Sequence, residues 1–381
     1  MMMAGQKGIG TVVVLGGGGF YGRYVVADLL AFTDVKVIVA SRNPPGEMVG
    51  GRVETAVCDL NKLPALIKLC QVADLIIHCA GPFQYMPINP LLAAIETGTD
   101  YIDIGEDRLF AQRVAQQRQA IMEAGITVLS GLSVAPALEA LAAQLLLPHF
   151  DRLHSVRTFA APDTKKHRGV AMFHTMLLGV GRPFQQLREG EEVTVHGWTE
   201  PEWVDFPAPI GRRLTHLVLE MSDLDLLPAY FNVKTVEFKA GTEFSFLNRL
   251  LNIAALLRAK TGYPAWEKLT PLVRAFSWLV GRWGQDNGGV FFEVVGWRGG
   301  EKVMYRWGIM AEKDGGLIPS ILAAIAAEKL WDGSLMTKGL LPHHDWLDRE
   351  ELVKRLRARG LRLWWQTPER PEWHGYEEGI V

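Results

Sequence analysis

Residues 11–22 read TVVVLGGGGFYG, and this stretch decides the fold of the first third of the chain. Its first five residues are mostly β-branched and apolar, which predicts a buried strand. Gly17, Gly19 and Gly22 follow with the G-x-G-x-x-G spacing, and residues 21–31 have helical periodicity. A strand, a glycine-rich turn and a helix in this order are typical of the first unit of a dinucleotide-binding fold. The glycines allow a tight turn, close approach of the backbone to a pyrophosphate, and close packing of the helix on the strand.

The alternation of strand and helix continues to about residue 147. Further strands are expected at 35–40, 53–57, 74–79, 101–104 and 126–130, with helices at 63–69, 87–97, 109–124 and 136–147. Such alternation is typical of parallel sheets covered by helices on both faces. We therefore predict an α/β fold, a Rossmann-type doubly wound parallel sheet, over residues 1–133.

The pattern after residue 133 changes to that of a second domain. Residues 134–316 mix strand and helix patterns, which predicts an inserted α+β domain. Because this domain leaves the chain beside the sheet edge where ligands bind, we expect it to bind substrate and close the site. An apolar helix at about 317–335 is expected to return to the first domain. For 336–381 we expect a helix with Asp348 as its N-cap, followed by an irregular tail.

The end of the second strand bears on the choice of cofactor. NAD-binding folds place an acidic residue there to hold the ribose 2′-hydroxyl, whereas this chain has Ser41 and Arg42. A guanidinium grips a 2′-phosphate well, so NADP is expected rather than NAD. Asp59 either borders the adenine or caps a helix. The residues expected to contact the cofactor are Gly16, Gly17, Gly19, Phe20, Tyr21, Gly22, Ser41, Arg42, Asp59, Ala80, Gly81 and Pro82.

Polar side chains follow the fourth and fifth strands, at the sheet edge where ligands bind in doubly wound folds. Asp103 and Glu106 could orient an amine or a bound water, or cap the next helix. The candidates for the catalytic proton donor are His78, Tyr85, Asp103 and Glu106. In the second domain, Lys165, Arg168 and His174 are candidate substrate ligands. The alternatives are a solvated loop for the two basic residues and a core histidine for His174.

Composition excludes several classes of partner. A formal net charge of −2 gives no general attraction to nucleic acid. The sequence contains no run of 18 apolar residues, so no transmembrane segment is expected. The N-terminal residues do not resemble a signal peptide, and the three cysteines form no C-x-x-C pair, so a cytoplasmic protein is expected.

His343, His344 and Asp345 lack a further ligand at metal-site spacing, so no metal is expected. The expected partner is a small molecule, and a homodimer through the second domain is left open.

Four stretches together resemble the saccharopine dehydrogenase-like family of NAD(P)-dependent oxidoreductases. They are VVVLGGGGFYGRYVVADLL, ADLIIHCAGPF, GTDYIDIGED and AGITVLSGLSVAPALEALA, all within residues 12–143. The resemblance implies hydride transfer at a C–N bond, an imine or secondary amine, of an amino-acid-like substrate. The alternatives are a carbonyl or enoyl reductase acting on an apolar substrate, and a non-catalytic NADP-binding sensor or scaffold protein.

Overall fold

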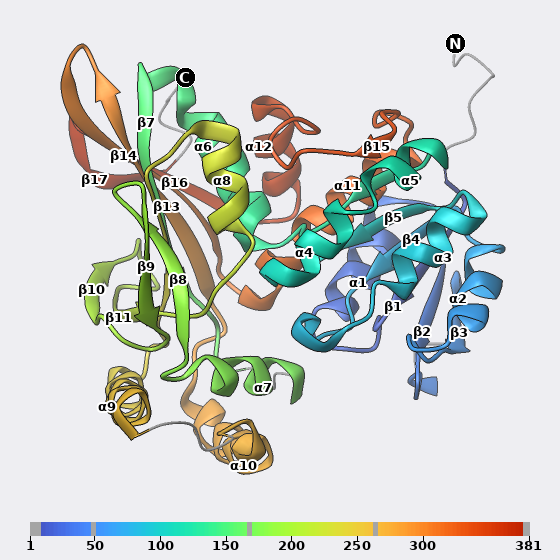
Figure 1. Cartoon of the computed structure of the whole chain (residues 1–381), viewed down its shortest axis with the longest axis horizontal. Helices are drawn as coiled ribbons and strands as arrows, with labels where there is room; N and C mark the ends of the chain where they lie inside the picture. Colours follow the sequence, from blue (N-terminus) through green and yellow to red (C-terminus); the bar gives the residue numbers. More distant parts are fainter. Residues whose placement is uncertain (1–8, 47–50, 166–169, 262–265, 376–381) are drawn as a thin grey trace. The chain divides into compact units, whose positions relative to one another are not determined.

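The computed structural model describes residues 9–46, 51–165, 170–261 and 266–375. These residues form two compact units (Figure 1). Unit 1 consists of Met1–Ala137 and Pro319–Trp346, and unit 2 consists of Leu138–Ile318 and Leu347–Val381.

Unit 1 contains a seven-stranded parallel sheet in the order β15-β6-β5-β4-β1-β2-β3. The predicted Rossmann-type fold is thus confirmed. The strands are β1 (Thr11–Leu15), β2 (Lys36–Ser41), β3 (Val53–Val57), β4 (Leu75–His78), β5 (Asp100–Asp103), β6 (Thr127–Leu129) and β15 (Gly339–Leu340). The helices are α1 (Gly22–Phe32), α2 (Leu63–Cys70), α3 (Asn89–Thr97), α4 (Arg108–Ala115), α5 (Arg118–Glu123) and α11 (Ile321–Trp331).

Burial on both faces explains why the central strands are apolar throughout. Every residue of β4 is buried, as are the last four of β1, because helices cover both sides of a parallel sheet. α11 is apolar on nearly all sides and packs against α1. The chain after α11 adds β15 beside β6, where Gly339 pairs with Thr127 and Leu340 with Val128.

Unit 2 contains an eight-stranded mixed sheet in the order β10-β11-β12-β7-β13-β14-β16-β17, and a separate hairpin of β8 and β9. Only β12 and β7 pair in parallel in the large sheet. The strands are β7 (Arg152–Ala161), β8 (Pro183–Arg188), β9 (Glu191–His196), β10 (Glu202–Asp205), β11 (Arg212–Leu217), β12 (Thr235–Ala240), β13 (Gly288–Arg298), β14 (Glu301–Ala311), β16 (Arg362–Thr367) and β17 (Arg370–Gly375). The helices are α6 (Glu139–Leu146), α7 (Val170–Gly179), α8 (Asp223–Phe231), α9 (Ser245–Thr261), α10 (Thr270–Val280) and α12 (Arg349–Ala358).

The end of the chain corrects one expectation. Asp348 caps α12 as predicted, since its Oδ1 accepts a hydrogen bond from the Glu351 amide at 2.9 Å. The irregular tail expected after this helix is wrong, because β16 and β17 extend the sheet of unit 2 as a hairpin. Leu363 and Trp365 alternate with less buried neighbours, as in a strand with one face buried. This alternation is too short to predict a strand by itself, and the segment is a strand because it pairs with the edge of β14.

Trp365 tests whether the hairpin is part of the core of unit 2. Its side chain is 4% exposed, so Trp365→Ala should lower the free energy of unfolding by about 3–5 kcal/mol in urea titrations. The matched change Trp283→Ala removes an exposed indole and should cost less than about 1 kcal/mol. Equal costs would show that β16 contributes no packing.

Candidate dinucleotide site

The glycine turn after β1 is held by backbone hydrogen bonds. The Gly16 amide donates to Ala40 O on β2 at 2.8 Å, and the Gly19 amide donates to Gly16 O at 2.8 Å. Gly18 and Gly19 are exposed at the tip of this turn, directly before α1. The backbone of the turn is therefore open to a ligand.

Two of the glycines leave no room for a side chain. Gly16 has φ +78°, and a Cβ atom there would lie 2.9 Å from Ala80 on the loop after β4. A Cβ on Gly22 would lie 2.2 Å from Gly16 O, so only glycine lets α1 approach the end of β1 this closely. This cradle fits a pyrophosphate, because the first turn of α1 contains no acidic residue that would repel phosphate.

The aromatic residues of the turn differ in their surroundings. Phe20 is buried and makes edge contacts with Tyr21 and Tyr24, at ring-centroid distances of 5.1 and 5.7 Å. Tyr21 is half-buried at the N-cap position of α1. Phe20 therefore acts through packing of the turn, and its ring faces the protein interior.

The end of β2 lies beside the glycine turn. Pro45, in the loop after β2, is close enough that a Cβ on Gly18 would come within 2.8 Å of its ring. Arg42 is exposed, and its charge contributes to a lowered pKa of Asp59, whose main cause is a hydrogen bond from the Asn61 amide. That bond, 3.1 Å long, closes a turn before α2, whose N-cap is Lys62. Asp59 thus stabilises the turn and lies near Arg42 without capping the helix itself.

Asp103 is the buried charge at the end of β5. Its side chain is 0% exposed, and Oδ1 accepts hydrogen bonds from the amides of Gly105 at 2.8 Å and Gly131 at 2.9 Å. Burial raises the pKa of Asp103 to about 6, against the opposing effect of these amides and, more weakly, of the Ser130 and Tyr101 hydroxyls. Asp103 therefore ties the loop after β5 to the loop after β6.

Glu106 and Asp107, in the loop after β5, have different hydrogen-bond partners. Asp107 caps α4, with Oδ1 accepting from the Phe110 amide at 2.8 Å. Glu106 is half-buried and accepts a hydrogen bond from the Ser133 hydroxyl at 2.6 Å. Burial raises the pKa of Glu106, while the Ser133 hydroxyl and the Ala135 and Val134 backbone act in the opposite direction. Asp103 and Glu106 thus both connect the end of β5 to the loop after β6, and Glu106 is the more accessible of the two.

His78 and Tyr85 lie in contrasting environments. The His78 ring is wholly buried, with Nδ1 3.2 Å from the Tyr101 hydroxyl and with Phe83 and Phe110 packed against it. Burial lowers the pKa of His78 to about 4, so the ring is neutral at physiological pH. Tyr85 is 56% exposed at the end of the 3₁₀ turn Phe83–Tyr85. Ala80, Gly81 and Pro82, all partly exposed, form the loop between them.

A known family model matches this same part of the chain. The model of the saccharopine dehydrogenase NADP binding domain aligns with residues 12–129, which run from β1 to β6. This part of the chain belongs to that domain family. The saccharopine dehydrogenase-type domain therefore supplies strands β1 to β6 of the sheet whose carboxyl edge carries the glycine cradle, Arg42 and Asp103.

Two curated relatives share parts of the chain. A probable mitochondrial saccharopine dehydrogenase-like oxidoreductase of Arabidopsis thaliana is 28% identical over 138 residues, which cover 31% of this chain and 30% of that protein. A saccharopine dehydrogenase-like oxidoreductase of Mus musculus is 28% identical over 92 residues, which cover 23% of this chain and 21% of that protein. The matched segments thus span less than a third of either relative.

The fold is similar over nearly the whole chain to a solved structure, an apo histidine-tagged saccharopine dehydrogenase (L-Glu forming) from Saccharomyces cerevisiae. The TM-score is 0.64 at 16% sequence identity, covering 94% of this chain and 99% of that one. At this identity the likeness concerns the fold alone.

His343 joins the saccharopine dehydrogenase-type domain at a place that the sequence did not indicate. Its Nε2 lies 2.6 Å from Ser130 O, and burial lowers its pKa to about 4, so the neutral ring donates this hydrogen bond. The pairing of β15 with β6 carries His343 to this loop, 213 residues along the chain from Ser130. Sequence spacing offered no signal for this contact. Within the described ranges, no three His, Cys, Asp or Glu side chains are grouped as metal ligands.

The candidate substrate residues belong to unit 2. Lys165 is exposed and its amide donates to Gln285 O at 3.1 Å, while His174 is half-buried on α7. Arg168 lies outside the described residues. A role in substrate binding stays a prediction for all three.

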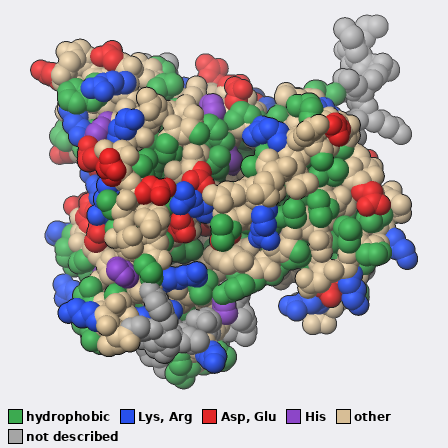
Figure 2. Space-filling model, viewed as in Figure 1, with side chains coloured by type: hydrophobic (Ala, Val, Ile, Leu, Met, Phe, Trp, Pro, Cys, Tyr) green, Lys and Arg blue, Asp and Glu red, His purple; other side chains and the backbone are tan. Residues whose placement is uncertain are grey.

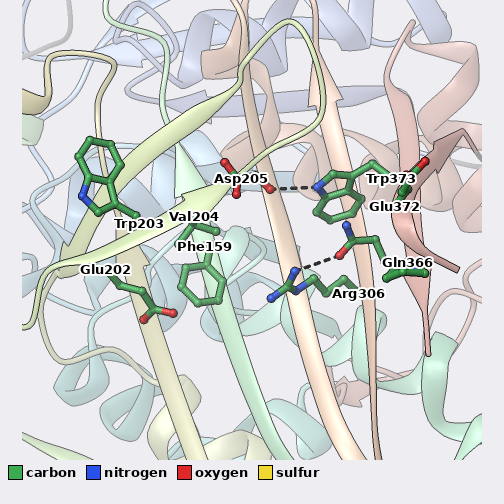
Figure 3. Close-up of a pocket in the computed structure, with 10 residues that line it drawn as sticks. Phe159, Glu202, Trp203, Val204, Asp205, Arg306, Gln366, Glu372 and Trp373 are labelled. Carbon is green, nitrogen blue, oxygen red and sulfur yellow. Dashed lines mark hydrogen bonds between the residues drawn. The ribbon is translucent and has the colours of Figure 1, made fainter. Parts of the chain in front are cut away.

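A cavity of about 450 Å³ lies on the large sheet of unit 2 (Figure 3). Phe159, Trp203 and Trp373 supply its apolar walls, and the Trp373 indole donates to Asp205 O at 2.9 Å. Arg306, the cation in its lining, already contacts Glu293 at 2.6 Å and Gln366 at 3.0 Å. Because this cation is already paired, the cavity is poorly suited to phosphates.

Asp103→Asn tests the buried charge through the pH dependence of stability. The pKa of this carboxyl is about 6 in the native state, against an ordinary value of 3.8. Between these two pH values the native state therefore binds more protons than the unfolded chain. Stability of the wild type should therefore fall as pH rises through this window. The amide variant does not titrate, so its free energy of unfolding should rise by up to about 3 kcal/mol relative to that of the wild type between pH 4 and pH 7.

Urea unfolding of both proteins across this range measures the difference. The control Asp34→Asn changes an exposed aspartate and should shift stability by less than about 0.5 kcal/mol at every pH. A constant difference between Asp103→Asn and the wild type would contradict a raised pKa.

Proposed function

We propose that the protein is an NADP-dependent oxidoreductase that transfers hydride at a C–N centre of an amino-acid-like substrate. The observation that carries the proposal is the cradle at Gly16 and Gly22, where side chains are sterically excluded while Gly18 and Gly19 stay exposed. It lies within a domain whose family is named for NADP binding. The oxidoreductase names of the two relatives support the class of reaction.

Arg42 supports NADP over NAD. It is exposed directly after β2, with Ser41 before it and no carboxylate at the strand end. The pKa of the nearby Asp59 is lowered mainly by a hydrogen bond from the Asn61 amide and to a smaller extent by the charge of Arg42. The Asp59 carboxylate also accepts a hydrogen bond from the Asn61 side chain. We infer that Arg42 and Ser41 hold the 2′-phosphate, because a guanidinium forms charge-assisted bonds with phosphate oxygens.

The two carboxylates at the ends of the strands receive different roles. Asp103 has no exposed surface, so we propose it as a positioning residue that holds the turns at Gly105 and Gly131. Glu106 is accessible, and the Ser133 hydroxyl fixes its direction, so we propose that Glu106 holds the proton that the C–N centre gains or loses. Bound nicotinamide would supply or accept the hydride.

The bond type is tested by following NADPH oxidation with pairs of amino acids and oxo acids, against ketones and enoyl compounds. Turnover with the amine–oxo acid pairs supports the proposal. Turnover only with apolar ketones or enoyl compounds would identify the alternative reductase. Tight NADPH binding without turnover on any substrate would favour a sensor or scaffold protein.

Gly19→Asp tests the cradle directly. A carboxylate at the tip of the turn would meet the pyrophosphate charge, so NADPH affinity by calorimetry should fall at least about 100-fold. Gly375→Asp is the matched control, because a Cβ at Gly375 meets nothing within 4 Å and the residue lies in unit 2. Unchanged affinity in Gly19→Asp would refute the placement of the pyrophosphate.

Arg42→Ala tests the reading of the 2′-phosphate. Loss of a charge-assisted hydrogen bond costs about 1.5–3 kcal/mol, so NADPH should bind about 10- to 150-fold more weakly while NADH affinity stays within about twofold. Lys36→Ala, at the opposite end of β2, removes a comparable exposed charge and should leave both affinities unchanged. Equal losses for the two cofactors would show that Arg42 does not contact the phosphate.

A further inference from the structure

Helix α9 of unit 2 directs three polar side chains, Asn248, Asn252 and Arg258, inward. Asn248 is fully buried and donates from Nδ2 to Leu214 O at 3.1 Å and to Thr242 O at 2.9 Å. Asn252 donates to Trp198 O at 2.8 Å, and Arg258 donates to Val180 O at 2.6 Å. These hydrogen bonds fix the rotation of the helix about its axis.

The opposite side of α9 is apolar and faces solvent. Phe246, Ile253 and Leu257 are 70%, 54% and 58% exposed, and Leu250 and Leu256 also lie on this side. Surface helices of globular proteins normally have the reverse arrangement, with the apolar side toward the core and the polar side toward solvent. The hydrogen bonds of the buried face prevent α9 from turning this stripe inward, so the exposure follows from the fold.

Helix α10 and the residues beside it extend the apolar surface. Leu269 and Leu272 are exposed, as are the indoles of Trp278 and, just beyond the helix, Trp283. Figure 1 shows α9 and α10 at the same end of unit 2, near α7, which contacts α10. We call the exposed apolar residues of 246–257 and 269–283 the α9–α10 face. Tryptophan prefers the boundary between hydrocarbon and water, where its ring and its N–H are both satisfied.

The charge of this surface is positive. Arg249, Lys260, Lys268 and Arg282 are exposed on or beside the α9–α10 face, and Figure 2 shows hydrophobic and basic side chains at this end of the unit. By sequence, residues 245–283 contain a single acidic residue, Glu267. Two such faces brought together would oppose like charges, which disfavours a second copy of this chain as the occupant. An anionic surface matches both the apolar and the basic groups.

We propose that the α9–α10 face binds the surface of an anionic lipid bilayer. The apolar side chains and indoles enter the headgroup region, and the four basic groups pair with lipid phosphates. The attachment is interfacial, since none of the described helices is long and apolar enough to cross a bilayer. This inference is independent of the proposed oxidoreductase activity.

Co-sedimentation of the full-length protein with vesicles tests the proposal. Vesicles of phosphatidylcholine with a third of phosphatidylglycerol should bind the protein, and binding should weaken at high salt. The variant Phe246→Ser/Ile253→Ser/Leu257→Ser should bind at least about tenfold more weakly, because buried apolar area drives insertion. Val72→Ser/Leu109→Ser/Met122→Ser removes three exposed apolar side chains of unit 1 and should bind like the wild type.

A charge variant separates the electrostatic contribution. Lys260→Gln/Lys268→Gln/Arg282→Gln should lose about fivefold per charge on anionic vesicles at low salt, and little on pure phosphatidylcholine. NADPH affinity should be unchanged in every variant, which keeps this test separate from that of the proposed function. Absence of wild-type binding to anionic vesicles would overturn the proposal. So would light scattering that shows a wild-type dimer and a monomeric apolar variant, because the face would then join two copies.

Discussion

The close contact between Gly22 and the carbonyl oxygen of Gly16 is the constraint on which unit 1 depends. A side chain at Gly22 would overlap that oxygen, so the start of α1 can lie against the end of β1 only with glycine at this position. The contact brings the positive end of α1 to the tip of the turn at Gly18 and Gly19. Strands β2 and β4 flank β1 in the sheet, so Arg42 and the loop at Ala80 are placed on either side of the same turn.

The carboxyl edge of the sheet is organised by a second constraint, the burial of Asp103. A charged group without exposed surface is costly unless hydrogen bonds compensate, and here two backbone amides do so only in part. The result is a raised pKa and a rigid link between the loops after β5 and β6. Around that link lie Glu106, which stays accessible, and His343, which holds the Ser130 carbonyl from a distant part of the chain. A rigid buried group beside an accessible one suits a site in which one residue positions and the other exchanges a proton.

Unit 2 shows a different use of polar groups. On the large sheet the three carboxylates Glu202, Glu237 and Glu293 pair with three cations, Arg157, Lys239 and Arg306, so the charges there neutralise one another. On α9, Asn248, Asn252 and Arg258 bond to backbone carbonyls instead, and this leaves the opposite side of the helix, with Phe246 and Leu257, exposed. The two arrangements explain why the sheet cavity is poorly suited to anions while the helical end of the unit is apolar and basic.

The sequence alone determined the features that arise from local periodicity and from residue types with special backbone demands. The apolar run before Gly16, the glycine spacing and the strand–helix alternation predicted the parallel sheet, and Asp348 predicted the start of α12, because each depends on neighbours within a few residues. The sequence did not predict strands β16 and β17, because their alternation of buried and exposed residues is short and they are held in the sheet by pairing with β14. His343, the burial of Asp103 and the outward turn of the apolar side of α9 were decided by the tertiary structure. Each depends on which distant backbone groups accept or donate a hydrogen bond, and residue spacing does not encode that.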